Sequence, residues 1–209
     1  MTRDVGTGLS GGALLLAIRY HSAARMGFAF EFRPQAPPPG DDLLQDVARW
    51  WSERPSSVEE WELPASEEGY FEKIVKACGL LERVEASEFR MSGFGKDWKL
   101  NVGYDMSAFV EGLPELSDGL SERTYAEVEL YPQGVEKVLG FEPVGKQVHI
   151  RCRSMWSAWT PADPVEVIAS TELIGMILRL QHDFARGLQM IDPLLAEIDP
   201  FDLWRAPSA

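Results

Sequence analysis

The sequence predicts an α+β fold: a mostly antiparallel sheet of about six or seven strands, with at least three helices packed mainly on one face. Two observations lead to this prediction. In residues 124–155, apolar side chains such as Val128 and Ile150 alternate with charged ones, which is typical of antiparallel strands with one buried and one solvated face. In residues 171–190, apolar side chains recur at helical spacing over an arc wide enough to cover one face of a sheet.

The same alternation predicts further strands at residues 26–32, 80–86, 88–91 and 98–104. Residues 92–96 then form the hairpin turn that precedes the last of these strands. Residues 107–123 contain Gly112, Pro114 and Gly119. Because glycine and proline interrupt regular structure, we expect a long loop there.

Two shorter amphipathic helices are expected in the first half of the chain. Residues 41–54 carry leucine, valine and tryptophan on one arc, with polar residues opposite. The second helix is expected to begin near Ser66, a residue type that caps helices. It is expected to end at Gly79, since glycine adopts the left-handed conformation at low cost.

The length of 209 residues is that of one domain, and we expect residues 1–209 to form one. Within it, we expect residues 1–12, which are rich in glycine, to be a flexible N-terminus. Residues 193–209 are expected to form a C-terminal tail. Residues 13–21 are an apolar run too short for its period to distinguish strand from helix.

The charge of the chain narrows the class of partner. The formal net charge is −13 and the pI is about 4.7. Nucleic acids and anionic membrane surfaces require a basic footprint, so neither is expected to bind. A strongly negative protein attracts a basic protein over long range. The alternative is that the charge serves solubility alone.

Cysteine usage and hydropathy indicate the compartment. Cys78 and Cys152 match no metal-site or redox spacing, and both lie on predicted apolar faces. We therefore expect no metal and a reducing cytoplasm. The longest apolar run, residues 13–18, is too short to span a bilayer.

Glycines near the start match two functional motifs. Gly6, Gly8 and Gly11 fit the G-x-G-x-x-G pattern of dinucleotide sites, and Gly8, Ser10 and Gly12 fit the G-x-S-x-G pattern of hydrolases. Both motifs need a leading strand, and only five residues precede Gly6. We therefore expect no cofactor and no catalytic serine here.

The best candidate for a binding surface is the acidic and aromatic stretch at residues 53–72. It holds seven acidic residues and one basic residue. Its carboxylates would attract a basic partner, and its aromatic rings would anchor it. The predicted partner-binding residues are Glu59, Glu60, Trp61, Glu62, Glu67, Glu68 and Tyr70. A solvated loop and helix face is the alternative.

A second set of polar and aromatic side chains forms the candidate ligand-binding residues. His149 lies on the solvated face of its strand, where an ion-pair ladder with Glu127 and Glu129 is the alternative. Gln181 falls inside the apolar arc of the last helix, where its amide needs partners. The candidate ligand-binding residues are His149, Trp156, Trp159 and Gln181.

Two classes of function remain open on the sequence. The first is a non-catalytic acidic interaction protein, such as an immunity or antitoxin-like protein that neutralises a basic partner. It is favoured by the charge and by the lack of a catalytic constellation. The second is a small enzyme or ligand-binding protein with a pocket between the sheet and the C-terminal helix.

Overall fold

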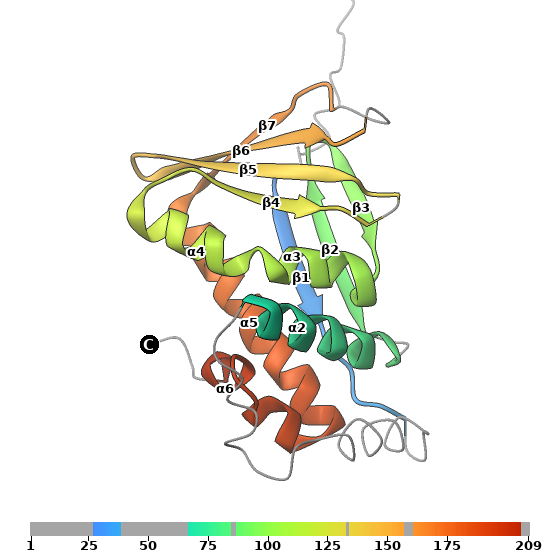
Figure 1. The fold of residues 1–209 in the computed structure, drawn as a ribbon. Coiled ribbons are helices and arrows are strands. Elements are labelled where there is room, and N and C mark those ends of the chain that lie inside the picture. The colour runs from blue at the N-terminus through green and yellow to red at the C-terminus, as the bar shows by residue number, and fades with distance from the viewer. Residues whose placement is uncertain (1–26, 39–66, 85–86, 133, 157–160, 206–209) are drawn as a thin grey trace, which may run out of the picture.

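The computed structural model describes residues 27–38, 67–84, 87–132, 134–156 and 161–205. Among these residues, seven antiparallel strands form two sheets (Figure 1). One sheet has three strands in the order β1-β2-β3, and the other has four in the order β4-β5-β6-β7. The α+β class is therefore confirmed, whereas the prediction of six or seven strands in a single sheet is wrong.

The three-stranded sheet consists of β1 (Ala29–Arg33), β2 (Glu88–Gly93) and β3 (Lys96–Leu100). A two-residue turn of Phe94 and Gly95, with φ of 56° and 75°, joins β2 to β3. Positive φ at both positions gives the turn the twist that a tight hairpin needs. The predicted turn at residues 92–96 is thus confirmed.

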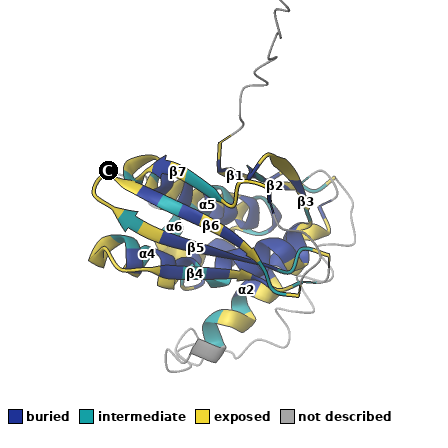
Figure 2. Cartoon of the chain, turned by 90° about the horizontal axis from the view of Figure 1, so that it is seen from above, coloured by how far each residue is buried: buried dark blue, intermediate teal, exposed yellow. Residues whose placement is uncertain are grey.

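The four-stranded sheet follows the chain in order. It consists of β4 (Ala126–Leu130), β5 (Lys137–Val144), β6 (Gln147–Ser154) and β7 (Val165–Ala169). Each strand pairs with the next, and the alternation that predicted β4 and β6 reappears as alternating burial. Figure 2 shows this alternation along β6, whereas the first five residues of β5 are all buried. The strand β7 was not predicted.

Helices lie below the four-stranded sheet (Figure 1). Helices also cover one face of the three-stranded sheet, where Phe30 and Phe32, on the same side of β1, contact Phe109 and Phe184 of two different helices. The helices of the described residues are α2 (Glu67–Glu82), η2 (Val102–Met106), α3 (Ser107–Glu111), α4 (Leu113–Glu122), α5 (Ser170–Ile191), η3 (Pro193–Glu197) and α6 (Phe201–Trp204). The predicted C-terminal helix is confirmed by α5. None of the helices in the described ranges combines the length and apolarity needed to cross a bilayer.

Two predicted boundaries are wrong. The helix α2 runs through Gly79 to Glu82, so residues 80–82 are helical rather than part of a strand. The buried stripe of Ile74, Cys78 and Leu81 outweighs the roughly 1 kcal/mol that one glycine costs inside a helix. The strand predicted at residues 98–104 ends at Leu100, and the chain enters η2.

The loop predicted at residues 107–123 is also wrong, because α3 and α4 occupy it. Pro114 lies in the first turn of α4, where its missing N–H costs no hydrogen bond. Phe109, Val110, Leu113 and Leu116 are buried at helical spacing. Glycine and proline here separate two short helices instead of preventing them.

Phenylalanine rings connect the layers of the core. Phe28 contacts Phe141 of β5 with ring centroids 6.1 Å apart, and Phe30 contacts Phe109 of α3 at 4.7 Å. Burying such a side chain contributes about 1.5–3 kcal/mol, so these contacts hold the β1 strand against both the second sheet and the helices.

The C-terminal tail predicted at residues 193–209 packs against α5 over its described part. Trp204 lies edge-on to Phe184, with centroids 5.4 Å apart. Cys78 and Cys152 are free and buried, as expected of small apolar side chains. The expectations for residues 1–12, 13–21 and 41–54 lie outside the described residues.

Candidate functional site

The predicted partner-binding stretch is only partly described. Glu59, Glu60, Trp61 and Glu62 lie outside the described residues. Glu67 and Glu68 form the start of α2, but the structure does not describe their side chains. Tyr70 is half-buried, and its hydroxyl donates to the Val110 carbonyl at 3.1 Å. Burial first, and then the charge of Glu111, raise the Tyr70 pKa far above its usual range.

Tyr70 therefore links α2 to α3, and other residues of α2 form the exposed surface. Phe71, Val75, Cys78 and Glu82 follow at intervals of four, three and four residues, which places them on one stripe of the helix. The first two are 48% and 39% exposed, so they leave an apolar area open to solvent.

Glu111, the last residue of α3, acts on this stripe through Cys78, whose pKa its charge helps to raise. Its Oε2 accepts a hydrogen bond from the Tyr131 hydroxyl at 2.9 Å, while its Oε1 is buried and has no hydrogen-bond partner in the described part of the chain. Burial raises the pKa of Glu111, although the bond from Tyr131 opposes this. Tyr131 is 46% exposed, and burial of its hydroxyl together with the neighbouring carboxylate raises its pKa to about 12.

The α2 side of this surface is also acidic. Burial, followed by the charges of Glu111 and Glu82, raises the pKa of Cys78 well above its usual value. The carboxylate of Glu82 lies against the backbone of Gly103 in η2, where a Cβ would overlap it. Burial raises the pKa of Asp105 in η2. The hydrogen bond that Asp105 accepts from the Asn101 N–H lowers this pKa, and the charge of Glu82 raises it further.

We call Phe71, Val75, Glu82, Glu111 and Tyr131 the carboxylate–aromatic face. Its residues come from α2, α3 and the end of β4, and Glu82 contacts η2. Like residues 53–72, it combines carboxylates with aromatic side chains. Sequence reasoning missed Glu111 because residues 107–123 were expected to form a loop. The apolar spacing of Phe109, Val110 and Leu113 was the signal that indicated a helix there.

The outer face of the four-stranded sheet carries one pair of the expected ion-pair ladder, between Arg153 and Glu127. Arg153 of β6 reaches Glu127 of β4 at 2.8 Å, across β5. Gly140 of β5 makes room for the ring of Tyr125, whose hydroxyl donates to Glu127. The pKa of Glu127 is lowered, first by this hydrogen bond and then by Arg153. Surface pairs of this kind contribute about 0.2–1 kcal/mol each.

The predicted ligand-binding residues are spread over different surfaces. His149 is half-buried on β6, opposite Glu142 of β5. Gln181 is half-buried on α5, Trp156 is 72% exposed after β6, and Trp159 lies outside the described residues. The groove between β1 and α5, of about 310 Å³, has none of the three described candidates among its lining residues.

That groove is lined by charged side chains from both elements. They include Glu31 and Arg33 of β1, and Arg179, Asp183 and Arg186 of α5. Arg33 pairs with Glu31 at 2.7 Å, and Arg186 pairs with Asp183 at 3.1 Å. The groove thus lies where the alternative prediction placed a pocket, but it uses arginines that the sequence analysis did not single out.

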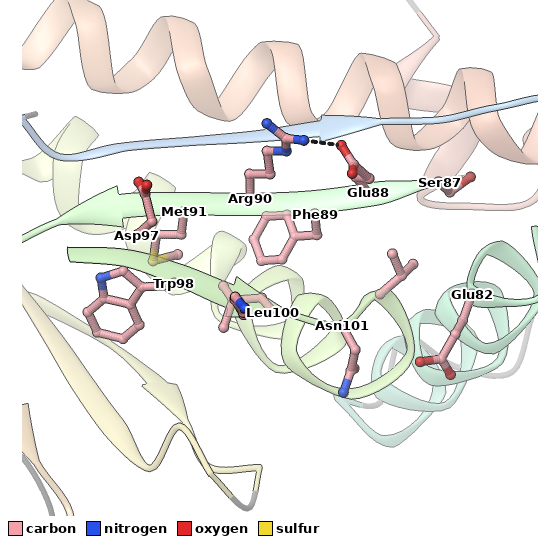
Figure 3. A pocket seen from close by; sticks show the side chains of 12 residues that line it. Glu82, Ser87, Glu88, Phe89, Arg90, Met91, Asp97, Trp98, Leu100 and Asn101 are labelled. Carbon is pink, nitrogen blue, oxygen red and sulfur yellow. Dashed lines mark ion pairs between the residues drawn. The ribbon is translucent and has the colours of Figure 1, made fainter. Parts of the chain in front are cut away.

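A larger groove, of about 630 Å³, runs along β2 and β3 toward Glu82 (Figure 3). Phe89 and Trp98 point to one side of the two strands, and Arg90 and Asp97 point to the other (Figure 3). A further groove of about 420 Å³ separates β3 from residues 134–137. The outer edge of β3 is therefore flanked by open space.

No family model matches this sequence, and no curated protein or solved structure is significantly similar to it. Within the described ranges, no three His, Cys, Asp or Glu side chains are grouped in a way that would hold a metal ion.

Proposed function

We propose that this chain is a non-catalytic interaction protein that binds and neutralises a basic protein partner, as immunity and antitoxin proteins do. The observation that carries the proposal is the Glu111 carboxylate, which has one buried oxygen without a hydrogen-bond partner in the described residues. Its other oxygen accepts a hydrogen bond from Tyr131, a 46% exposed aromatic side chain of the carboxylate–aromatic face.

An unsatisfied buried acceptor costs about 1–3 kcal/mol, and more when it is charged. A lysine or arginine of a partner would remove this cost and form a charge-assisted hydrogen bond. Glu82 on the same face adds a second carboxylate for a basic surface. The net charge of −13 supports the same partner, because it speeds the encounter with a positive protein.

The apolar part of the face supports a protein rather than a small cation as the partner. Phe71 and Val75 are one turn apart on α2, and Tyr131 lies beside Glu111. Aromatic side chains next to a desolvated charge are typical of the residues that dominate protein–protein affinity. The neighbouring stretch at residues 59–62 remains a predicted extension of this surface.

The test is affinity capture from the organism that encodes the chain, at low ionic strength, with the wild type, Glu111→Gln and Glu129→Gln. Glu129 is exposed on β4, so its substitution changes the net charge equally without touching the face. We expect a basic protein in stoichiometric amount, held at least tenfold less tightly by Glu111→Gln and nearly unchanged by Glu129→Gln.

Failure to recover any basic protein at low salt would contradict the proposed function. Equal weakening by both substitutions would contradict the assigned face, because net charge alone would then explain binding. Thermal unfolding of each variant shows whether the fold is retained, so that a loss of binding is not confused with a loss of structure.

A second candidate function is supported by the groove between β1 and α5. Three arginines, Arg33, Arg179 and Arg186, line it and would recognise carboxylate or phosphate groups. We propose a small anionic ligand for this groove. Titration calorimetry with dicarboxylates and phosphate monoesters, repeated on Arg179→Ala, tests this. Absence of heat with the wild type would exclude these ligand classes.

A further inference from the structure

The outer edge of β3 is the feature of this fold most suited to pairing with another strand. In the described part of the chain, β3 pairs with β2 on one side and with no strand on the other. Asp97 and Lys99 are exposed, and grooves lie on both sides of the strand. An edge strand presents backbone donors and acceptors that a further strand can use.

The hairpin geometry decides which residues present those groups. Gly93 and Lys96 flank the two-residue turn and face each other, so they exchange backbone hydrogen bonds. Hydrogen-bonded and non-bonded pairs alternate along an antiparallel ladder, so the even-numbered residues of β3 point their backbone groups toward β2. Asp97 and Lys99 therefore direct their N–H and C=O groups toward the outer edge.

We propose that two copies of this chain pair through β3, antiparallel, about a two-fold axis that passes beside Trp98. In this register Asp97 of each copy lies opposite Lys99 of the other. Each of the two pairs forms a hydrogen-bonded ring, so four backbone hydrogen bonds join the strands. The two three-stranded sheets become one continuous sheet.

Charge complementarity selects this register. Two other two-fold registers also match outward-facing backbone groups, but they place Asp97 opposite Asp97 or Lys99 opposite Lys99. Like charges directly opposite each other destabilise a strand pair, whereas opposite charges stabilise it. Only the proposed register brings together unlike charges, and it does so twice.

The surroundings of Lys99 support the same partner. Lys99 lies opposite Arg90 of β2, a like-charged neighbour, and Arg90 is paired with Glu88 at 2.7 Å. Asp97 of a second copy would give Lys99 a carboxylate on its other side. A lysine usually protects an edge strand from pairing, but here the antiparallel register turns it into half of an ion pair.

Because both copies use the same edge, the contact is closed and stops at the dimer. A contact based on one five-residue strand is small, and interfaces that bury less than about 1,200 Å² belong to weak complexes. The proposed dimer pairs through Asp97 and Lys99 of β3, and no residue of the carboxylate–aromatic face lies on that strand, so either proposal can fail while the other stands.

The test is sedimentation velocity of the full chain at low salt, from about 10 µM to about 1 mM, where weak self-association is detected. The variants are Asp97→Lys, Lys99→Asp and the double exchange Asp97→Lys/Lys99→Asp. Each single substitution sets two like-charged pairs across the axis, and we expect at least about tenfold weaker dimerisation. The double exchange restores two unlike pairs and is expected to restore the dimer.

Glu129→Lys is the matched control, since it changes the net charge by the same amount as Asp97→Lys but lies on β4. It is expected to leave dimerisation unchanged. Circular dichroism melting shows that each variant is folded. A wild type that stays monomeric to 1 mM overturns the proposal. So does a folded double exchange that remains as weak as the single substitutions.

Hydrogen exchange of the backbone amides identifies the surface directly. The amides of Asp97 and Lys99 are expected to become protected as the concentration rises, while those of Trp98 and Leu100 are protected throughout. A dimer that forms without protection of Asp97 and Lys99 uses another surface and overturns the proposal.

Discussion

Two tyrosine–glutamate pairs in this molecule form the same kind of hydrogen bond, but the pKa values of their carboxylates are shifted in opposite directions. On the outer face of the four-stranded sheet, Tyr125 donates to Glu127, and the pKa of Glu127 is lowered. Between β4 and α3, Tyr131 donates to Glu111, and the pKa of Glu111 is raised. The hydrogen bond is common to both pairs, so it does not decide the direction of the shift.

The difference arises from what surrounds each carboxylate. Glu127 has Arg153 at 2.8 Å and faces solvent, so its charged form is favoured. Glu111 is partly buried, and its second oxygen has no partner in the described residues, so burial disfavours its charge. The first pair is complete within the chain, whereas the second has capacity for a cation that the described residues do not supply.

The largest expected effect separates the two tyrosines. We expect Tyr131→Phe to lower the free energy of unfolding by about 1–2 kcal/mol at pH 7, because it leaves a partly buried carboxylate with no hydrogen bond. Tyr125→Phe is expected to cost less than about 0.5 kcal/mol, since Arg153 and water still contact Glu127. Urea unfolding measures both, and equal losses would contradict the comparison.

The next effect has opposite signs in the two pairs. Glu111→Gln is expected to raise the free energy of unfolding by about 1 kcal/mol at pH 7, because a neutral amide is cheaper to bury than a carboxylate. Glu127→Gln is expected to lower it by about 0.2–1 kcal/mol, because an ion pair is lost. Thermal or urea unfolding checks the signs, and a destabilised Glu111→Gln variant would show that its charge is needed for folding.

The pH dependence sharpens the same contrast. For Glu111, the folded-state pKa lies above the unfolded-state value of 4.5. Between these two pKa values the folded state binds more protons than the unfolded state, so the free energy of unfolding falls as pH rises. For Glu127, the folded-state pKa lies below 4.5, so its stabilisation is present above that value and is lost as pH falls through the folded pKa.

Unfolding curves of the wild type and the two glutamine variants between pH 3 and pH 7 measure these dependences. The advantage of Glu111→Gln is expected to disappear at low pH. The destabilisation caused by Glu127→Gln is also expected to disappear at low pH, because protonation of Glu127 in the wild type removes the charge that the variant lacks. A pH-independent difference for either variant would rule out ionisation as its cause.

The smallest expected effect is the response to salt. A double-mutant cycle between Glu127 and Arg153 is expected to give a coupling of about 0.2–1 kcal/mol at low ionic strength. At about 1 M salt the Debye length falls to about 3 Å, so the coupling should shrink toward zero. The effect of Glu111→Gln is expected to persist, because its cause is burial. Salt sensitivity of the Glu111 effect would indicate a solvated carboxylate instead.

Part of the candidate site followed from sequence and part did not. The combination of carboxylates and exposed rings was predicted for residues 53–72, and the described end of that stretch lies on the carboxylate–aromatic face through Phe71. Glu111 and Tyr131 were not predicted. They lie 20 residues apart and meet only because α3 and the end of β4 pack together.

Local periodicity by itself determined the elements whose faces differ in polarity, namely β1, β2, β4, β6 and the helix α5. In these elements apolar residues face the core and polar residues face solvent, so the order of neighbouring residues along the chain is enough to predict them. The short helices α3 and α4 were hidden by Gly112 and Pro114, because a break between two helices and a loop use the same residue types.

Only the tertiary structure decided that the seven strands of the described residues divide into two sheets, because strand pairing joins residues far apart in the chain. It also decided which of two equivalent tyrosine–glutamate pairs was buried and which was solvated. Sequence specifies the chemistry of each group, but burial and the nearest counter-charge come from packing, and these set the energy of a carboxylate.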